Sequence, residues 1–450
     1  MLGKHILDKD GYYSKLISIS WPIFLESLLR LLLGNVNIFM LGQYSDDAVG
    51  AVGVANQIIN LVLVMYGIVS MGTVIMVSQS IGAGERKVAG RIANIALVAN
   101  LAFGIILSLS ITLLAVPLLK LMNLPEELFD YAYQYLVIAG AFTFLQAFMA
   151  ALSGISRSYG YTKLPMYVAL GMNFLNLIGS YASLYGPFGI PVLGVPGVAA
   201  AMVASELLAA IFLFILVYKK IGLSIRLSDF RPFPKDIVKT LLKVGIPSAG
   251  ESMAYTFAQM ATTYIVAMFG AASITARVYG SSISVFSGTL GAAFGQGSQL
   301  LVGRLVGAGD HRKAYKICFN ALKMATASNA VISFMFFLFG RQLAGIFTRD
   351  PAIIEMVYIV LAIDMAVELG RASNLVIGNS LRGAGDVKFP VIISVLSMWG
   401  VSVTLCYVLG VVLDLGLTGI WIAFAADECF RGVLMYKRWK SRAWVGMSVV

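Results

Sequence analysis

Charged residues are scarce in this sequence: they make up 12% of its 450 residues, whereas 59% are hydrophobic. A soluble domain of ordinary composition carries about 25% charged residues. This scarcity excludes a large soluble domain. Apolar stretches follow one another along the chain, and most can cross a bilayer core of about 30 Å at about 1.5 Å per residue. The composition therefore predicts an all-α polytopic membrane protein.

Histidine and cysteine are also nearly absent, with two and three residues. His5 and His311 lie in polar segments, which leaves no histidine-based active site within the apolar stretches. The cysteines Cys318, Cys406 and Cys429 lack CxxC spacing, so they indicate neither a disulfide framework nor a zinc site. A membrane-embedded transferase would need a catalytic histidine or a DxxxD-type metal cluster. We therefore expect no enzyme activity, no metal and no cofactor.

The apolar stretches predict twelve membrane-spanning helices. Their approximate ranges are 16–41, 50–80, 92–118, 129–153, 164–186, 195–218, 240–267, 274–303, 314–340, 353–379, 389–411 and 417–437.

Basic residues gather in every second connection between these predicted helices. The connections 43–47, 185–194 and 414–416 contain no Lys or Arg. Because short cytoplasmic loops carry an excess of Lys and Arg, both termini are predicted to be cytoplasmic. The protein is predicted to lie in the plasma membrane. The residues of the basic side include Lys4, Lys9, Lys15, Arg86, Lys87, Arg157, Lys163, Arg226, Lys235, Arg304, Arg312, Arg382, Lys388 and Lys437.

The chain contains an internal repeat. Pro22 and Glu26 recur as Pro247 and Glu251, since 247 − 22 = 225 and 251 − 26 = 225. An even number of predicted spans separates the copies, so they share one topology about an axis along the membrane normal. We therefore predict two six-helix bundles with pseudo-two-fold symmetry, 1–220 and 237–450, joined by a cytoplasmic linker, 221–236. Further pairs at the offset of 225 are Gly82 and Gly307, Arg157 and Arg382, Gly160 and Gly385, Lys163 and Lys388, and Pro165 and Pro390; Glu206 and Glu428 are 222 apart.

Short motifs in these two halves resemble those of multidrug and toxic compound extrusion (MATE) transporters. The motifs are Val36–Gly42 followed by Ala51–Gly53, the Gly82–Gly84 turn, and Leu381–Asp386. The resemblance covers nearly the whole chain. It implies a V-shaped pair of six-helix bundles around a central cavity, and cation-driven export of drug-like compounds.

The sequence departs from the family pattern where the coupling ion binds. Members with an N-half proton site have aspartates where Asn37 and Ser180 stand here, and members with a C-half cation site have one near Arg371. The ion-binding residues of those members therefore do not carry over. Neither the choice between H⁺ and Na⁺ nor the half that binds the ion follows from the resemblance.

Glu26 and Glu251 lie inside apolar stretches, where a carboxylate at the bilayer centre costs roughly 3 kcal/mol. Glu26 has Arg30 four residues later, on the same helical face. The two either form a buried ion pair, or Glu26 faces the cavity and changes partner during transport. Glu251 instead has Tyr255 and Gln259 on its face, and no base. We predict that Glu251 binds a cation or substrate, with these two residues as contacts.

The predicted span 353–379 carries Asp364, Glu368 and Arg371 on one face, followed by Asn374. Two acids and one base leave a surplus negative charge if all are ionised. This group is either a network that stabilises a kinked helix or the coupling-ion site, with Glu251 opposite it.

Roles of the other polar residues within the apolar stretches are predicted from their positions in the repeat and along the helices. Asn37 continues the face of Glu26, and Asn173 and Asn176 are predicted to form hydrogen bonds between helices; the resemblance also places their helix at the N-half cavity. Glu206 and Glu428 are a symmetric pair, and a structural role, in which each contacts another helix, is favoured over a role in transport.

Two transport functions remain open at this point. The first is a secondary active exporter, a cation-coupled H⁺ or Na⁺ antiporter of small cationic or amphipathic organic compounds, working by alternating access. The alternative is a lipid-linked sugar or lipid flippase of the same superfamily, whose cavity would favour more bases than Arg30 and Arg371. Expected partners are the substrate and the lipid bilayer, with a monomeric chain. The net charge of +11 lies in the loops and does not indicate nucleic acid.

Overall fold

The computed structural model describes residues 11–122, 124–189, 191–222 and 227–450, and these contain helices and no strand. The predicted linker 221–236 lies partly outside the described residues, as do His5 and the basic residues Lys4, Lys9 and Arg226. The helices of the first half are α1 (Tyr12–Tyr44), α2 (Asp46–Gly82), α3 (Arg86–Leu113), α4 (Ala115–Leu121), α5 (Glu126–Ala141), α6 (Phe144–Ser158), α7 (Lys163–Tyr185) and α8 (Gly194–Ile221). Those of the second half are α9 (Lys235–Ala267), α10 (Ala271–Gly307), α11 (His311–Leu338), α12 (Gly340–Phe347), α13 (Pro351–Ala384), α14 (Lys388–Ser397), α15 (Thr404–Tyr407) and α16 (Gly416–Lys440).

Every predicted span coincides with helical residues, which confirms the helical class. Six of the described helices are long and apolar enough to cross a membrane, and there are seven if α5 and α6 together form one bent span. The predicted span 389–411 is a composite, in which α14 and α15 alternate with π-helical stretches at Met398–Val403 and Val408–Val412.

The predicted span 129–153 is broken, because α5 and α6 meet at an angle of 43°. The break is supported by side chains. Ser108 Oγ accepts a hydrogen bond from the backbone N–H of Phe144 at 2.8 Å, and Thr143 Oγ1 accepts one from Tyr66 at 2.9 Å. A helix can bend at such a point because the freed backbone donor has a partner.

The predicted span 92–118 also ends early, where α3 gives way to the short α4 at Leu114. Pro117 explains this break. Proline has no N–H to donate, and its ring clashes with the carbonyl group four residues earlier, here that of Leu113.

Contacts divide the chain into two compact units. Unit 1 contains residues up to Phe24, Ser78–Glu85 and Pro247–Val450, and unit 2 contains Leu25–Val77 and Arg86–Ile246. The helices α1, α2 and α9 therefore each have residues in both units. The boundary between the units lies two residues after Pro22 in α1 and directly before Pro247 in α9. A proline inside a helix removes one backbone hydrogen bond. The predicted bundles 1–220 and 237–450 stay predictions.

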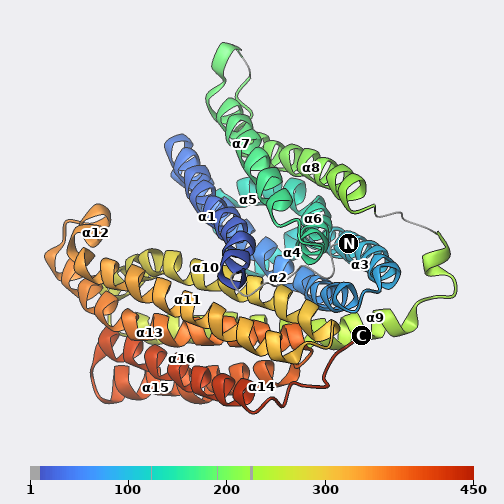
Figure 1. The fold of residues 1–450 in the computed structure, drawn as a ribbon. Helices are drawn as coiled ribbons and strands as arrows, with labels where there is room; N and C mark the ends of the chain where they lie inside the picture. Colours follow the sequence, from blue (N-terminus) through green and yellow to red (C-terminus); the bar gives the residue numbers. More distant parts are fainter. Residues whose placement is uncertain (1–10, 123, 190, 223–226) are drawn as a thin grey trace. The chain divides into compact units, whose positions relative to one another are not determined.

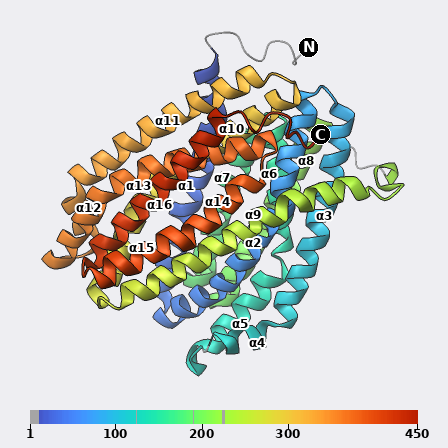
Figure 2. The same cartoon turned by 90° about the horizontal axis from the view of Figure 1, so that it is seen from below.

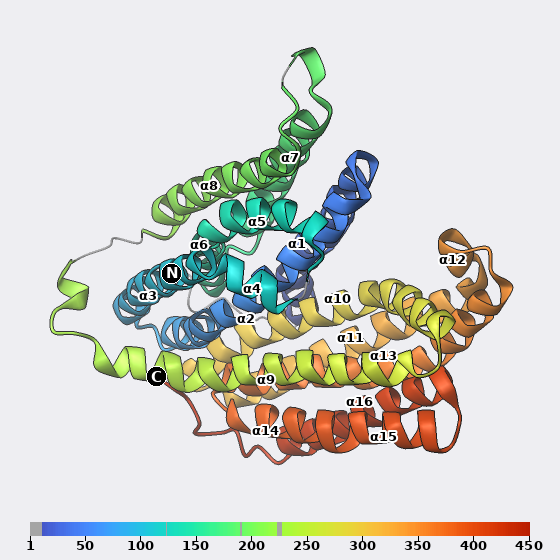
Figure 3. The same ribbon diagram turned by 180° about the vertical axis from the view of Figure 1, so that it is seen from behind.

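Within unit 1, α13 contacts α10, α11 and α16 (Figure 1), and α16 also contacts α14 and α15 (Figure 2). Within unit 2, α8 contacts α5, α6 and α7 (Figure 3). Each unit has its own apolar core. The core of unit 1 surrounds Val360 and Trp421, and the core of unit 2 surrounds Leu136 and Val198. The helices that carry the candidate polar residues are thus packed on several sides.

The repeat extends to backbone conformation. Gly84 and Gly309 have φ angles of 82° and 73°, and Gly160 and Gly385 have φ angles of 95° and 99°. Both pairs are 225 residues apart, since 309 − 84 = 225 and 385 − 160 = 225. Left-handed φ angles favour glycine, so these turns explain why glycine stands at both copies.

The segment that follows α16 packs against unit 1. The ring of Trp444 is fully buried and stacks on Trp439, with 4.3 Å between the ring centroids. Four and five residues later in the chain, the hydroxyl group of Ser448 and the backbone N–H of Val449 both donate to Gln79 Oε1 at 2.9 Å. These contacts predict that the segment stabilises unit 1.

We expect Trp444→Ala to destabilise the protein by about 3–5 kcal/mol, the usual cost of truncating a buried tryptophan. Thermal denaturation of the purified protein in detergent measures the effect. Trp399→Ala is the matched control, because Trp399 is 43% exposed. Equal shifts in the two variants would show that burial of Trp444 contributes nothing specific.

Candidate functional site

Glu26 on α1 is held mainly by a base from another helix of unit 2. Arg157 Nη2 on α6 lies 2.6 Å from Glu26 Oε2. Arg30, the predicted partner, is 3.6 Å from Glu26 Oε1, and its side chain is 70% exposed. Exposed ion pairs contribute about 0–1 kcal/mol, so Arg157 is the partner that matters for stability.

Glu251 on α9 also has a base, which comes from another helix and not from its own helical face. Arg382 Nη2 on α13 lies 2.5 Å from Glu251 Oε2, and both side chains are largely buried. The spacing along one helix could not reveal this partner, which comes from a distant part of unit 1. The repeat could have revealed it: 157 − 26 = 131 and 382 − 251 = 131, so both halves contain the same ion pair.

Both ion pairs lie level with the last turn of a helix. Arg157 is one residue from the end of α6 at Ser158, and Arg382 is two residues from the end of α13 at Ala384. Membrane helices end near the membrane surface because the connecting loops lie in water. We therefore expect the pairs to lie nearer to one membrane face than to its middle.

Tyr255 and Gln259, the predicted companions of Glu251, belong to a different group of contacts. Gln259 Nε2 donates to the Tyr255 hydroxyl group at 3.0 Å, and Gln259 Oε1 accepts from Arg277 Nη2 at 2.9 Å. Arg277 on α10 also donates to Thr263 at 2.7 Å. The structure thus brings these two residues to an arginine and not to the glutamate.

Glu368 on α13 is the centre of a polar network in unit 1, and its side chain has no exposed surface. It forms an ion pair with Arg371 and accepts hydrogen bonds from Ser287 on α10 and Asn329 on α11, each at 2.9 Å. One turn earlier, Asp364 accepts from the indole N–H of Trp421 on α16 at 3.2 Å. Glu368 therefore connects α13 with α10 and α11. These contacts provide the hydrogen-bond partners that a buried carboxylate needs.

The same network continues into α16 through Glu428. Asn374 donates to Glu428 Oε2 at 2.5 Å, and Arg371 Nε lies 3.9 Å from Glu428 Oε1. Arg431 is 2.8 Å from Glu428 and 2.7 Å from the neighbouring Asp427. Sequence spacing found the α13 members but could not join them to Asp427 and Arg431 on another helix.

We call this set the C-half network. It contains four carboxylates and two guanidinium groups, so two negative charges remain uncompensated if all six groups are ionised. Its members are Asp364, Glu368, Arg371, Asp427, Glu428 and Arg431.

In unit 2, Asn37 Nδ2 on α1 donates to Asn176 Oδ1 on α7 at 2.8 Å. Asn176 therefore forms a hydrogen bond between two helices. Asn173, one turn earlier on α7, is half-buried and does not take part in it. The oxygen atoms Asn37 Oδ1 and Ser180 Oγ are buried without a hydrogen-bond partner among the described residues.

Glu206 and Glu428, predicted as a symmetric structural pair, both contact another helix but have different environments. Glu428 contacts two arginines and an asparagine, as described above. Glu206 on α8 accepts a hydrogen bond from Gln146 Nε2 on α6 at 2.8 Å. The shared repeat position thus carries a glutamate with arginine partners in unit 1 and a glutamate with a neutral partner in unit 2.

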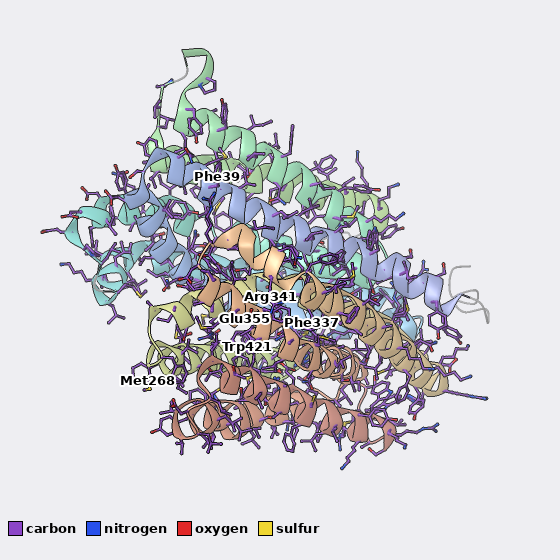
Figure 4. All side chains as sticks on the ribbon, turned by 90° about the vertical axis from the view of Figure 1, so that its left-hand side faces the viewer. Phe39, Met268, Phe337, Arg341, Glu355 and Trp421 are labelled. Carbon is purple, nitrogen blue, oxygen red and sulfur yellow. The ribbon has the colours of Figure 1, made fainter. Side chains whose placement is uncertain are left out.

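An exposed ion pair outside the network provides a reference. Arg341 on α12 and Glu355 on α13 are labelled close to each other in Figure 4. Arg341 Nε is 3.0 Å from Glu355 Oε2, and both side chains are at least half exposed. Such a pair is expected to contribute little to stability.

Known sequences that resemble this chain are those of transporters, and the family match also shows the internal repeat. The MatE family model matches residues 22–182 and 247–408. The two matches begin 225 residues apart, since 247 − 22 = 225. An uncharacterized transporter, YisQ of Bacillus subtilis (strain 168), is 42% identical over 430 residues, covering 96% of this chain and 94% of its own. A probable multidrug resistance protein, NorM of Thermotoga maritima, is 30% identical over 439 residues, covering 95% and 93%.

Comparison with solved structures supports the fold. A multidrug resistance MATE family transporter of the MOP superfamily, solved in an outward-facing conformation, matches with a TM-score of 0.88 and 19% identity, over 96% of each chain. A MOP superfamily transporter from Pyrococcus furiosus, described as having a binding pocket of reverse polarity, matches with a TM-score of 0.87 and 19% identity, also over 96% of each chain.

Proposed function

Because this chain belongs to the MATE family, whose members are membrane transporters and not enzymes, we propose that it is a cation-coupled antiporter. Its exported substrates are small cationic or amphipathic organic compounds, and the coupling ion is H⁺ or Na⁺. The chain has twelve spans in two six-helix bundles, and both termini lie in the cytoplasm. The two bundles move against each other, so that the substrate site opens to one side of the membrane at a time. The chain works as a monomer in the plasma membrane and needs no cofactor beyond the transported ion.

The observation that carries this proposal is the surplus negative charge of the C-half network. A buried network with two uncompensated carboxylates is costly unless a cation or proton joins it. Glu368 is the most buried member, and Arg371 is 30% exposed, so the network extends from the packed interior to an accessible edge. A cation and a cationic substrate would stabilise the same group, which is the basis of exchange.

The proposal revises the order of candidate residues. Glu251 was predicted as the main cation-binding carboxylate, and its pairing with Arg382 favours a structural role. Glu26 has the equivalent partner in Arg157. Asp364 and Glu368 therefore become the leading candidates, with Arg371 and Asn374 as their neighbours.

The test is efflux from vesicles under separately imposed gradients. The purified protein is reconstituted into liposomes loaded with ethidium, a lipophilic cation, and H⁺ and Na⁺ gradients are applied one at a time. We expect at least one gradient to accelerate ethidium efflux above that of protein-free liposomes. If neither gradient moves ethidium while labelled lipid-linked sugar crosses the bilayer, the flippase function replaces this proposal.

A further inference from the structure

Glu206 is a buried carboxyl group without a base. It is 6% exposed, and Gln146 Nε2 donates a hydrogen bond to its Oε1 at 2.8 Å. In the part of the chain that the structure describes, no Lys or Arg forms an ion pair with it, whereas Glu26, Glu251, Glu368 and Glu428 all have one. An isolated buried carboxylate normally acquires a partner or a proton.

The helices around Glu206 do not provide the missing charge. The phenols in electrostatic range are Tyr135 on α5 and Tyr66 on α2, and both donate elsewhere: Tyr135 to Asn56 at 3.4 Å and Tyr66 to Thr143 at 2.9 Å. Arg30 on α1 is also in range, but its side chain is largely exposed and approaches Glu26. On α7, the only charged residue is Lys163, at the first position of the helix.

The repeat shows that this lack of a base is particular to the N-terminal half. Glu428 corresponds to Glu206, since 428 − 206 = 222, and Arg431 corresponds to Ala209 at the same offset. Arg371 corresponds to Gln146, since 371 − 146 = 225. The two arginines that form ion pairs with Glu428 thus correspond to uncharged residues, Gln146 and Ala209, in the half that contains Glu206.

The surroundings of Glu206 suit a proton better than a metal cation. Hard cations such as Ca²⁺ take about six or more oxygen ligands, and Na⁺ equally needs several. The described partner of Glu206 is an amide that presents its NH₂ group, which repels a metal cation. A proton needs only the carboxyl oxygen that Gln146 does not contact.

We propose that Glu206 is a proton-binding carboxyl group of the N-terminal half, which holds a proton in this state and releases it during transport. The carboxylic acid gives its proton to water and becomes a carboxylate, and no other bond changes. The position differs from Asn37 and Ser180, where the family resemblance places aspartates. The release step rests on the proposed antiport function, but binding of the proton does not.

Infrared difference spectroscopy of the reconstituted protein tests the proposal without a substrate. A pH jump from neutral to alkaline should remove a carbonyl band of a protonated carboxylic acid in the wild type. Glu206→Gln should lack this band, and the exposed acid variant Glu355→Gln should retain it. A band of unchanged size in a folded Glu206→Gln protein overturns the proposal.

A second variant keeps the test decisive if Glu206→Gln fails to fold. Gln146→Arg installs the base that stands at the same place in the C-terminal half, where an arginine beside a glutamate is compatible with the fold. We expect this variant to keep Glu206 ionised, so that it loses the carbonyl band and takes up one proton fewer per chain on acidification. Persistence of the band in Gln146→Arg also overturns the proposal.

The experiments separate this inference from the proposed function. If ethidium efflux follows an ion gradient but the carbonyl band is independent of Glu206, the chain is an antiporter and only the inference fails. If the band depends on Glu206 but no gradient drives efflux, Glu206 binds a proton and the antiport function fails.

Discussion

Replacing Glu251 by glutamine is expected to destabilise the protein by about 3–5 kcal/mol, because it leaves a buried arginine without its carboxylate. Arg382 and Glu251 are 2.5 Å apart, and only 13% and 14% of their side chains are exposed. Glutamine can accept one hydrogen bond from Arg382 but cannot neutralise its charge. Thermal denaturation in detergent, with membrane expression as a second measure, should show the loss.

Glu26→Gln should have a similar effect, since Arg157 lies 2.6 Å from Glu26 and is also mostly buried. From the sequence, Glu26 either pairs with Arg30 or faces the cavity, whereas Glu251 binds a cation or substrate, and these different roles predict different effects of the two substitutions. The equivalent ion pairs replace that expectation with one shared outcome.

A charge exchange is the control for this prediction. The double variant Glu251→Arg with Arg382→Glu keeps the two opposite charges and should recover most of the lost thermal stability. Each single variant should be unstable, so the double-mutant cycle gives a favourable coupling between the two positions. Normal stability of Glu251→Gln, together with lost transport, would restore the original assignment of Glu251 to cation binding.

The positions of the helices and the internal repeat could be predicted from the sequence alone. Apolar stretches of membrane length leave few alternatives to helix, because every backbone polar group in lipid needs a partner within its own segment. The positions of α1, α8 and α16 follow closely from this rule. The breaks at Thr143 and Leu114 were missed because one depends on side chains of other helices and the other on Pro117 within an otherwise apolar run.

The candidate site was predicted only where its residues share one helix. Asp364, Glu368 and Arg371 were found by their spacing, since residues three and four apart lie on one helical face. Arg157, Arg382 and Arg431 were missed as partners because spacing along a helix says nothing about contacts between helices. The repeat did hold part of this information, since the offset of 225 relates Glu26 to Glu251 and Arg157 to Arg382.

Glu368→Gln is expected to weaken cation-driven efflux by about 10-fold to 150-fold, the equivalent of losing about 1.5–3 kcal/mol of charge-assisted interaction. The change removes one negative charge from the buried centre of the C-half network. Glutamine can still accept hydrogen bonds from Ser287 and Asn329 through its carbonyl oxygen, and Arg371 keeps Glu428 as a second partner. Folding and membrane expression should therefore be largely retained, unlike in Glu251→Gln.

The measurement is the initial rate of ethidium efflux from proteoliposomes, at matched protein content, under the gradient that drives the wild type. Glu355→Gln is the matched control on the same helix, because its exposed partner Arg341 is not buried when the charge is lost. This control should transport like the wild type, since an exposed ion pair contributes about 0–1 kcal/mol. Normal efflux by a folded Glu368→Gln protein would mean that the surplus charge of the network serves the packing of α10, α11, α13 and α16, and that the transported cation binds elsewhere.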